Sequence, residues 1–124
     1  MDWTFRGDLP IYSQLIEQIK LAIVSGSLLP GQRLASVRDM ATEAGVNPNT
    51  MQRVLQELEC EGMVYSQRTA GRFVTEDMRV IERSKHQFAE ERIREFLEAM
   101  KKIGYRREEV ITLLEQKEEG NADT

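Results

Sequence analysis

Amide and guanidinium side chains gather on one side of the segment 49–56. At about 100° per residue of a helix, these polar side chains share one face, and an apolar stripe occupies the opposite face. The polar face consists of Asn49, Gln52, Arg53 and Gln56, and the stripe consists of Met51, Val54, Leu55 and Leu58. Amides and guanidinium groups match the donor and acceptor edges of base pairs in a major groove. The pattern predicts a face that reads nucleic acid, although the glutamines could be plain surface residues and Arg53 could pair with Glu57.

Other reactive side chains are too isolated for catalysis or metal binding. Cys60 is the only cysteine and His86 the only histidine, which excludes a CxxC metal pair, a disulfide within the chain and a multi-histidine site. Carboxylates fall beside lysines and arginines along helical faces, a pattern typical of a solvated surface. We therefore expect no enzyme activity, no metal and no cofactor.

The charge balance restricts how nucleic acid could be bound. The chain of 124 residues holds 17 Lys and Arg against 21 Asp and Glu, a formal net charge of -4. Proteins that bind DNA through bulk electrostatics usually carry a basic domain, so a site here must use a few placed cations. The chain has no apolar run of about 18 residues and no secretion signal at its start, which predicts a cytoplasmic protein without a membrane segment.

Capping residues place two short helices close together. Ser36 is suited to begin a helix over 37–44, and Gly45 is suited to end it in a left-handed conformation. Asn47, followed by a proline, indicates the start of a third helix, because proline is favoured at the first helical position. Together with a first helix over 11–25, the short turn predicts a helix-turn-helix. The alternative is a small three-helix domain with a solvated face.

Two short strands follow the third helix. The segments 63–66 and 72–75 have strand-forming compositions, and a polar segment with basic side chains joins them. A basic hairpin directly after a helix-turn-helix is the layout of a winged helix, and residues 33 and 34 could add a very short strand. We predict a mainly α (α+β) fold, with a winged helix-turn-helix DNA-binding domain over residues 1–75.

Residues 76–124 have the pattern of two amphipathic helices. A long charged helix over 76–102 and a shorter one over 107–116 are joined by a Gly-Tyr turn, and residues 118–124 are expected to fray. Two such helices cannot bury their apolar faces alone, so we expect a homodimer. The alternative is that this tail folds back on its own domain. The predicted dimerisation residues are Ile81, Phe88, Phe96, Leu97, Met100, Val110, Leu113 and Leu114.

Three segments match a known family in the right order and spacing. They are PIYSQLIEQIK at 10–20, PGQRLASVRDMA at 30–41 and GVNPNTMQRVLQELECEGMVY at 45–65. These segments resemble the GntR superfamily of bacterial regulators, and the NPNT run and the two-helix tail are most similar to its YtrA-like subfamily. The resemblance implies a winged helix-turn-helix homodimer that represses transcription at an inverted-repeat DNA operator. The positions that match the family's DNA-contacting places are Arg38, Asn47, Asn49, Thr50, Gln52 and Arg68.

Helical geometry adds Arg53 to this set, and Arg72 is added as a second basic residue of the hairpin. We expect Arg38, Thr50 and the amides at the start of the third helix to hold phosphates. The outward side chains at 49, 52 and 53 could reach base edges, and the two hairpin arginines could enter a minor groove. Asn47 could serve only as a cap, because capping and base contact need different uses of one side chain.

Two positions depart from the family's pattern. AlaSerValArg stands at 35–38 where ProSerValArg is typical, so the start of the second helix could be less rigid. Thr69 follows Arg68 where a glycine is typical at the wing tip, and its bulk is expected to limit how closely the wing approaches a groove.

The tail and the function leave two further questions open. The residues after Thr75 are too few for the metabolite-binding domain of larger relatives, so a pocket between the tail helices is where an unidentified small-molecule effector would bind. The alternative function is a winged-helix module that docks protein partners without specific DNA binding. A steep loss of affinity with rising salt would favour DNA.

Overall fold

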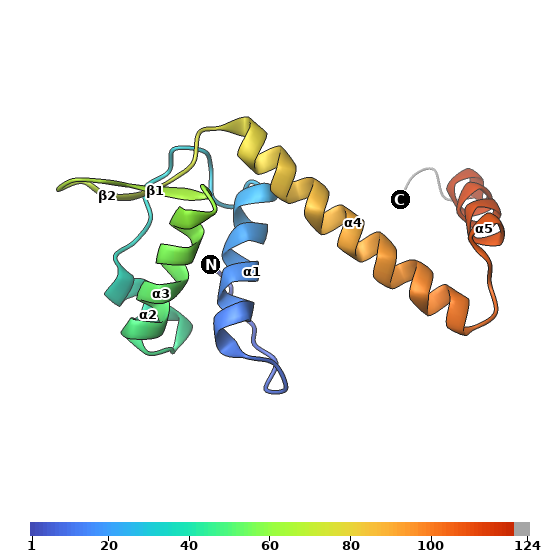
Figure 1. The fold of residues 1–124 in the computed structure, drawn as a ribbon, viewed down its shortest axis with the longest axis horizontal. Coiled ribbons are helices and arrows are strands. Elements are labelled where there is room, and N and C mark those ends of the chain that lie inside the picture. Colours follow the sequence, from blue (N-terminus) through green and yellow to red (C-terminus); the bar gives the residue numbers. More distant parts are fainter. Residues whose placement is uncertain (121–124) are drawn as a thin grey trace. The chain divides into compact units, whose positions relative to one another are not determined.

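The computed structural model describes residues 1–120, with the side chains of residues 1–117. The elements of this range are, in order, α1 (Ile11–Val24), α2 (Val37–Ala44), α3 (Pro48–Cys60), β1 (Val64–Gln67), β2 (Gly71–Val74), α4 (Met78–Lys102) and α5 (Arg107–Gly120) (Figure 1). The fold is the mainly α winged helix-turn-helix that the sequence predicts. Residues from Met1 to Lys85 form one compact unit, and those from His86 onward form a second. None of the helices in residues 1–120 combines the length and apolarity needed to cross a bilayer.

The start of α1 is organised by a buried glutamine. Pro10 precedes the helix and provides no side-chain cap. Gln14 instead holds the preceding loop: its Nε2 donates to Arg6 O at 2.8 Å and to Leu9 O at 3.0 Å, and its Oε1 accepts from Arg6 N at 2.7 Å. Because the side chain of Gln14 is buried, these bonds satisfy an amide that water does not reach.

The helix-turn-helix begins and ends where its capping residues predict. Ser36 Oγ accepts a hydrogen bond from Asp39 N at 3.1 Å, and Gly45 ends α2 with a φ of 71°. Asn47 Oδ1 accepts from Asn49 N at 2.7 Å at the start of α3. The predicted apolar stripe of α3 is fully buried and consists of Met51, Val54, Leu55 and Leu58. The turn therefore fixes which face of α3 points outward.

The hairpin after α3 forms a sheet with a short third edge. β1 and β2 pair antiparallel, with Val64 opposite Val74 at the root and Gln67 opposite Gly71 near the tip. Each strand lies one residue closer to the tip than its predicted segment. The expected short strand at 33 and 34 is present as an isolated antiparallel bridge between Arg33 and Phe73.

The core of the first unit draws on all of its helices and both strands. Its largest fully buried side chains are Leu15, Ile19, Met51, Val54, Leu55, Leu58, Met63 and Val74. Ile81, in the first turns of α4, joins this core and is 4% exposed. Ile81 is therefore a core residue of the first unit and not the dimerisation residue that we expected. For the same reason this unit extends to Lys85 and does not end at Thr75.

The second unit holds the rest of α4 and α5. Tyr105 N donates to Met100 O at 3.0 Å, and Gly104 turns the chain with a φ of 98°. α5 runs from Arg107 to Gly120, past its expected end at residue 116. Residues 118–120, which we expected to fray, therefore belong to α5. The rest of the segment expected to fray, residues 121–124, lies outside the described residues.

Candidate nucleic-acid interface

The outer face of α3 carries the side chains that the sequence predicts there. Asn49, Arg53 and Gln56 are exposed, and Thr50 and Gln52 are half-buried. The buried stripe on the opposite side holds this face outward. The amide and guanidinium groups therefore lie together on an open helical surface, where they could reach the edges of base pairs.

The first turn of α3 offers fewer free amides than we expected for phosphate binding. Pro48 has no N–H, Asn49 N donates to Asn47 Oδ1, and Met51 N donates to Asn47 O at 3.1 Å. Within residues 1–120, this leaves the Thr50 amide as the one in this turn without a partner. Asn47 is thus a cap in this structure, and its carboxamide oxygen already accepts the hydrogen bond from the Asn49 amide.

Arg53 is held by an aromatic ring of α1. Its guanidinium lies over the ring of Tyr12, 4.9 Å from the centroid, and the i+4 pair with Glu57 is not formed among the described side chains. A guanidinium stacked on an aromatic face keeps its hydrogen-bond donors free at the edge of the plane. Tyr12 therefore restricts where Arg53 can point without neutralising its charge.

Arg72 of the hairpin is tied to α3 by an ion pair with Glu59. Its Nε donates to Glu59 Oε1 at 2.5 Å, and the same oxygen accepts a hydrogen bond from Ser66 Oγ. Together the bonds from Ser66 and Arg72 hold the pKa of the Glu59 carboxyl below its ordinary value. In this structure one donor of Arg72 is therefore engaged by a carboxylate of α3, and its contact with DNA stays a prediction.

The wing tip consists of residues 68–70, between β1 and β2. Arg68 is exposed there. Thr69 adopts a φ of 65°, the left-handed conformation that glycine takes without strain. The departure at Thr69 therefore falls on a position whose backbone favours glycine.

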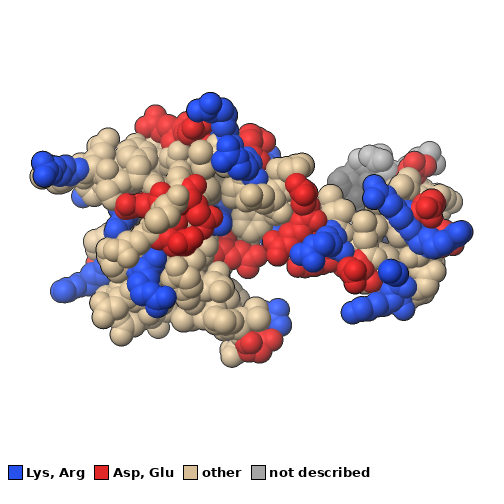
Figure 2. Space-filling model, viewed as in Figure 1, with Lys and Arg blue, Asp and Glu red and all other residues tan. Residues whose placement is uncertain are grey.

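The lysines and arginines of residues 1–75 divide into two sets. The paired set is Arg6 with Asp8, Lys20 with Glu61 and Arg72 with Glu59. The set that meets no acid among the described residues is Arg33, Arg38, Arg53 and Arg68. In Figure 2, basic side chains project at the hairpin tip and beside the start of α3. Arg38, Arg53 and Arg68 thus belong to α2, α3 and the wing tip, the elements that a winged helix presents to DNA, and Arg33 lies in the bridge strand before α2.

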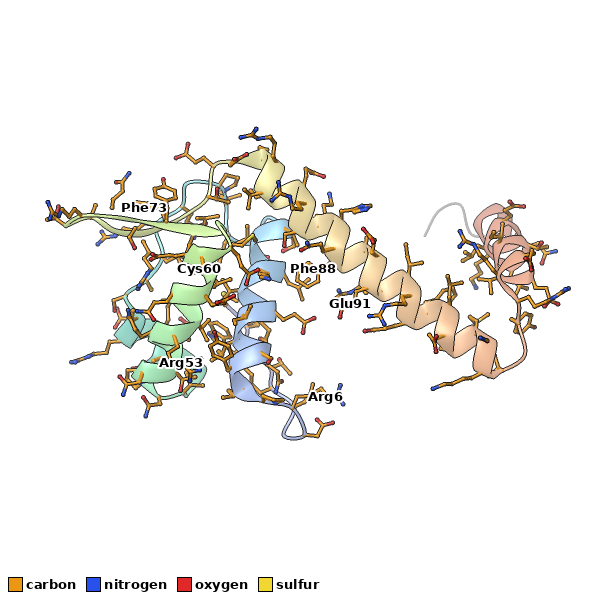
Figure 3. All side chains as sticks on the ribbon, in the orientation of Figure 1. Arg6, Arg53, Cys60, Phe73, Phe88 and Glu91 are labelled. Carbon is orange, nitrogen blue, oxygen red and sulfur yellow. The ribbon has the colours of Figure 1, made fainter. Side chains whose placement is uncertain are left out.

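Arg33 is the cation of this set that sequence reasoning missed. The signal that could have found it was present, because a short strand at 33 and 34 must pair with an edge of the hairpin. Its partner, Phe73, lies on the side of the hairpin away from α3 (Figure 3).

The second unit leaves most of its predicted apolar residues uncovered. Val110 is 2% exposed, so contacts within this unit already cover it. The half-buried residues of the predicted set are Phe88, Leu97 and Met100, and the exposed ones are Phe96, Leu113 and Leu114. A hollow of about 340 Å³ between α4 and α5 is lined in part by Leu97, Tyr105 and Val110.

Comparison with known sequences identifies relatives of this chain. Residues 11–74 match the family described as "Bacterial regulatory proteins, gntR family". The HTH-type transcriptional regulator YhcF of Bacillus subtilis, itself uncharacterized, is 39% identical over 111 residues, which cover 90% of this chain and 92% of that protein. The HTH-type transcriptional repressor YtrA of Bacillus subtilis is 40% identical over 72 residues, 58% of this chain and 55% of the repressor.

Solved structures extend the similarity to the fold. A GntR family transcriptional regulator from Listeria monocytogenes superposes with a TM-score of 0.81 at 37% identity, covering 90% of this chain and 98% of that one. The DNA-binding domain of AraR in complex with operator ORX1 superposes with a TM-score of 0.55 at 29% identity, covering 60% of this chain and 96% of that domain.

Proposed function

Because the chain belongs to the GntR family of bacterial regulatory proteins and is a transcription regulator of that family, we propose that it binds an inverted-repeat DNA operator as a homodimer. In this proposal it acts in the cytoplasm as a repressor. The observation that carries the proposal is the exposed amide and guanidinium face of α3, flanked by arginines that meet no acid within 4.0 Å among the described residues. The structure of the AraR domain with its operator supports the choice of DNA as the ligand.

Each side chain of this surface has a distinct task in the proposal. Asn49, Gln52 and Arg53 read base edges in the major groove, since amides and guanidinium groups match adenine and guanine there. Arg38 and Thr50 bind phosphates at the edge of that groove. The exposed arginine at the wing tip, residue 68, enters the adjacent minor groove, where negative potential is concentrated.

The second unit supplies the dimer in this proposal. Phe96 is 43% exposed and Leu114 is 54% exposed, and such side chains on α4 and α5 need a partner surface to be buried. A second copy of the chain is the occupant that a twofold operator requires, because recognition helices spaced by about 34 Å match two half-sites. YhcF supports this assignment, since its similarity to this chain continues through most of the tail.

The name of a relative supports repression, and a hollow in the second unit supports the binding of an effector. YtrA of Bacillus subtilis is named a repressor. The hollow between α4 and α5 is the place where we expect an unidentified small-molecule effector to bind, with Leu97 and Tyr105 in its wall. A ligand there would act on the helices assigned to the dimer.

A DNA-binding titration tests the proposal. Sites selected from random duplexes by the wild-type protein should have two inverted half-sites, and binding to them should weaken steeply as salt rises. The double variant Arg38→Ala, Arg53→Ala should lose at least about tenfold in affinity, since the base contact of Arg53 is worth about 1–3 kcal/mol and Arg38 adds a phosphate contact. The variant Arg83→Ala is the matched control, because it removes an exposed cation of α4.

Three outcomes would contradict the proposal. Unchanged binding by the double variant would refute the residue assignment. Selection of single, unpaired half-sites would refute the dimer. Tight binding of a protein partner, with DNA affinity that hardly responds to salt, would favour the docking module over a DNA-binding regulator.

A further inference from the structure

We propose that Arg33 is a second DNA-contacting cation of the wing and that it binds a backbone phosphate beside the groove that Arg68 enters. The inference rests on the proposed function, because it requires the wing to lie against DNA. It goes beyond that function in assigning a contact to the strand before α2, outside the helix-turn-helix and the hairpin.

The backbone around Arg33 is pinned to the wing on both sides. Arg33 pairs with Phe73 in an antiparallel bridge, Leu34 N donates to Arg72 O at 2.8 Å, and Val74 N donates to Gln32 O at 2.8 Å. A residue held in register with a strand has a defined side-chain direction, because successive side chains point to opposite faces. Arg33 therefore shares a face of the sheet with Phe73.

That face is the one not occupied by α3. Arg72, the neighbour of Phe73 in β2, points to Glu59 of α3, so Phe73 and Arg33 lie on the other side. Figure 3 shows Phe73 on the side of the hairpin away from α3. Arg33 and Arg72 thus lie on opposite faces of one small sheet, and among the side chains of residues 1–117 only the cation on the α3 side has a carboxylate partner.

A glycine lets the guanidinium of Arg33 lie close to the wing tip. A Cβ atom at Gly71 would stand 3.3 Å from Arg33 Nε and 3.7 Å from Nη2, so the guanidinium covers the backbone where β2 begins. Gly71 has a φ of 105°, a conformation that side-chain-bearing residues rarely adopt. The charge of Arg33 is consequently carried to the strand end next to residues 68–70.

The charge of Arg33 is available for a phosphate. Its side chain is exposed and meets no acid within 4.0 Å among the described residues. Glu76 approaches the root of the same face, where its Oε1 accepts a hydrogen bond from Tyr65 Oη at 3.2 Å. A guanidinium held along a strand edge with free donors suits a phosphate oxygen, which a planar fork of N–H groups binds well.

The salt dependence of DNA binding tests this assignment. Affinity is measured for the full chain on one selected operator duplex and one unrelated duplex, between 50 and 200 mM salt. Each lost phosphate contact lowers the slope of log affinity against log salt by about 0.9, or about 1.8 for a dimer. For Arg33→Gln we expect that shift, together with the same fold loss of affinity on both duplexes, because a phosphate contact is independent of sequence.

Two further variants distinguish an effect of the Arg33 charge from a structural effect of the substitution. Arg33→Lys keeps the cation and should keep the wild-type slope, whereas a merely structural role would leave the slopes of both variants unchanged. Arg83→Gln removes an exposed cation of α4 and should also leave the slope unchanged. A wild-type slope for Arg33→Gln, on a protein that binds the operator in a salt-dependent way, overturns the inference alone. Salt-independent binding by the wild-type protein overturns the proposed function instead.

Discussion

The ion pair between Glu59 and Arg72 couples the wing to the recognition helix, and removing either partner should loosen the wing. The perturbation is a cycle of Glu59→Gln, Arg72→Gln and the double variant. Glutamine keeps the size of the carboxylate in the first variant and removes the guanidinium in the second. The difference between the double variant and the sum of the single variants isolates the pairwise contribution to the free energy of unfolding.

The structure sets the size of the expected coupling. Arg72 Nε and Glu59 Oε1 are 2.5 Å apart, and the side chains are 19% and 31% exposed, respectively. Exposed pairs contribute about 0–1 kcal/mol, and breaking a buried pair costs about 3–5 kcal/mol. Because this pair is partly exposed, solvent screening brings its coupling toward the lower range, and we expect about 1 kcal/mol.

The coupling should depend on pH in a defined direction. Hydrogen bonds from Ser66 and Arg72 hold the pKa of the Glu59 carboxyl below its ordinary value of 4.5. The folded state therefore binds this proton less tightly than the unfolded chain does. The stability that Glu59 contributes is fully present above about pH 4.5 and is lost as the pH falls through the lower pKa of the folded protein.

Urea denaturation of the four proteins at pH 7 and pH 3 measures both quantities. The coupling should be near 1 kcal/mol at pH 7 and smaller at pH 3. Salt titration of DNA binding provides a second readout: Arg72→Gln should keep the slope that Arg68→Gln lowers. A coupling of zero at pH 7, or equal loss of slope in the two arginine variants, would refute the assignment of Arg72 to Glu59.

Three further predictions concern the loop before α1, the wing tip and the tail. Gln14→Leu should lower the free energy of unfolding, measured by urea denaturation, by about 2–3 kcal/mol, because it leaves buried backbone groups without partners. A change below about 0.5 kcal/mol would contradict the role of Gln14 in holding the loop before α1. Thr69→Gly should raise the free energy of unfolding by about 0.5–1 kcal/mol, since relief of a positive φ outweighs the added entropy of the unfolded chain, whereas Thr69→Ala should gain less. Equal melting temperatures of the wild-type protein and Thr69→Gly would rule out strain at the tip. Leu114→Glu should lower the molar mass measured by light scattering after gel filtration from that of a dimer to that of a monomer, whereas Glu115→Gln should not change it. An unchanged mass for Leu114→Glu would show that this residue is not part of the dimer surface.

Local rules account for the parts of the fold that the sequence predicts well. Ser36 and Asn47 satisfy backbone amides two or three residues away, and Gly45 ends its helix by its own conformation. Such effects act over one turn of chain, so they are visible in sequence order. The hairpin was also predictable, because strand composition and a polar tip adjoin each other.

Contacts between distant segments account for the differences. Arg53 is exposed on the outer face of α3 as expected, but the partner that holds it is the ring of Tyr12 on another helix and not Glu57 one turn away. Ile81 fitted the periodicity of the tail, yet the first turns of α4 pack on the core of the first unit. Periodicity shows that a residue has an apolar neighbour but does not show which segment provides it.

The acidic net charge and the proposed DNA surface are compatible because of where the acids lie. Asp8, Glu59 and Glu61 neutralise cations of the loop before α1, of β2 and of α1. Among the described residues, no acid pairs with the arginines of the proposed surface. The proposed surface therefore relies on a few cations that meet no acid among the described residues, while the net charge of -4 of the chain disfavours polyanions. Nonspecific DNA binding depends on the sum of phosphate contacts over any orientation, so it should be weak here. An operator that engages the unpaired arginines in one orientation avoids that repulsion, and the ratio of specific to nonspecific affinity should consequently be large for so small a domain.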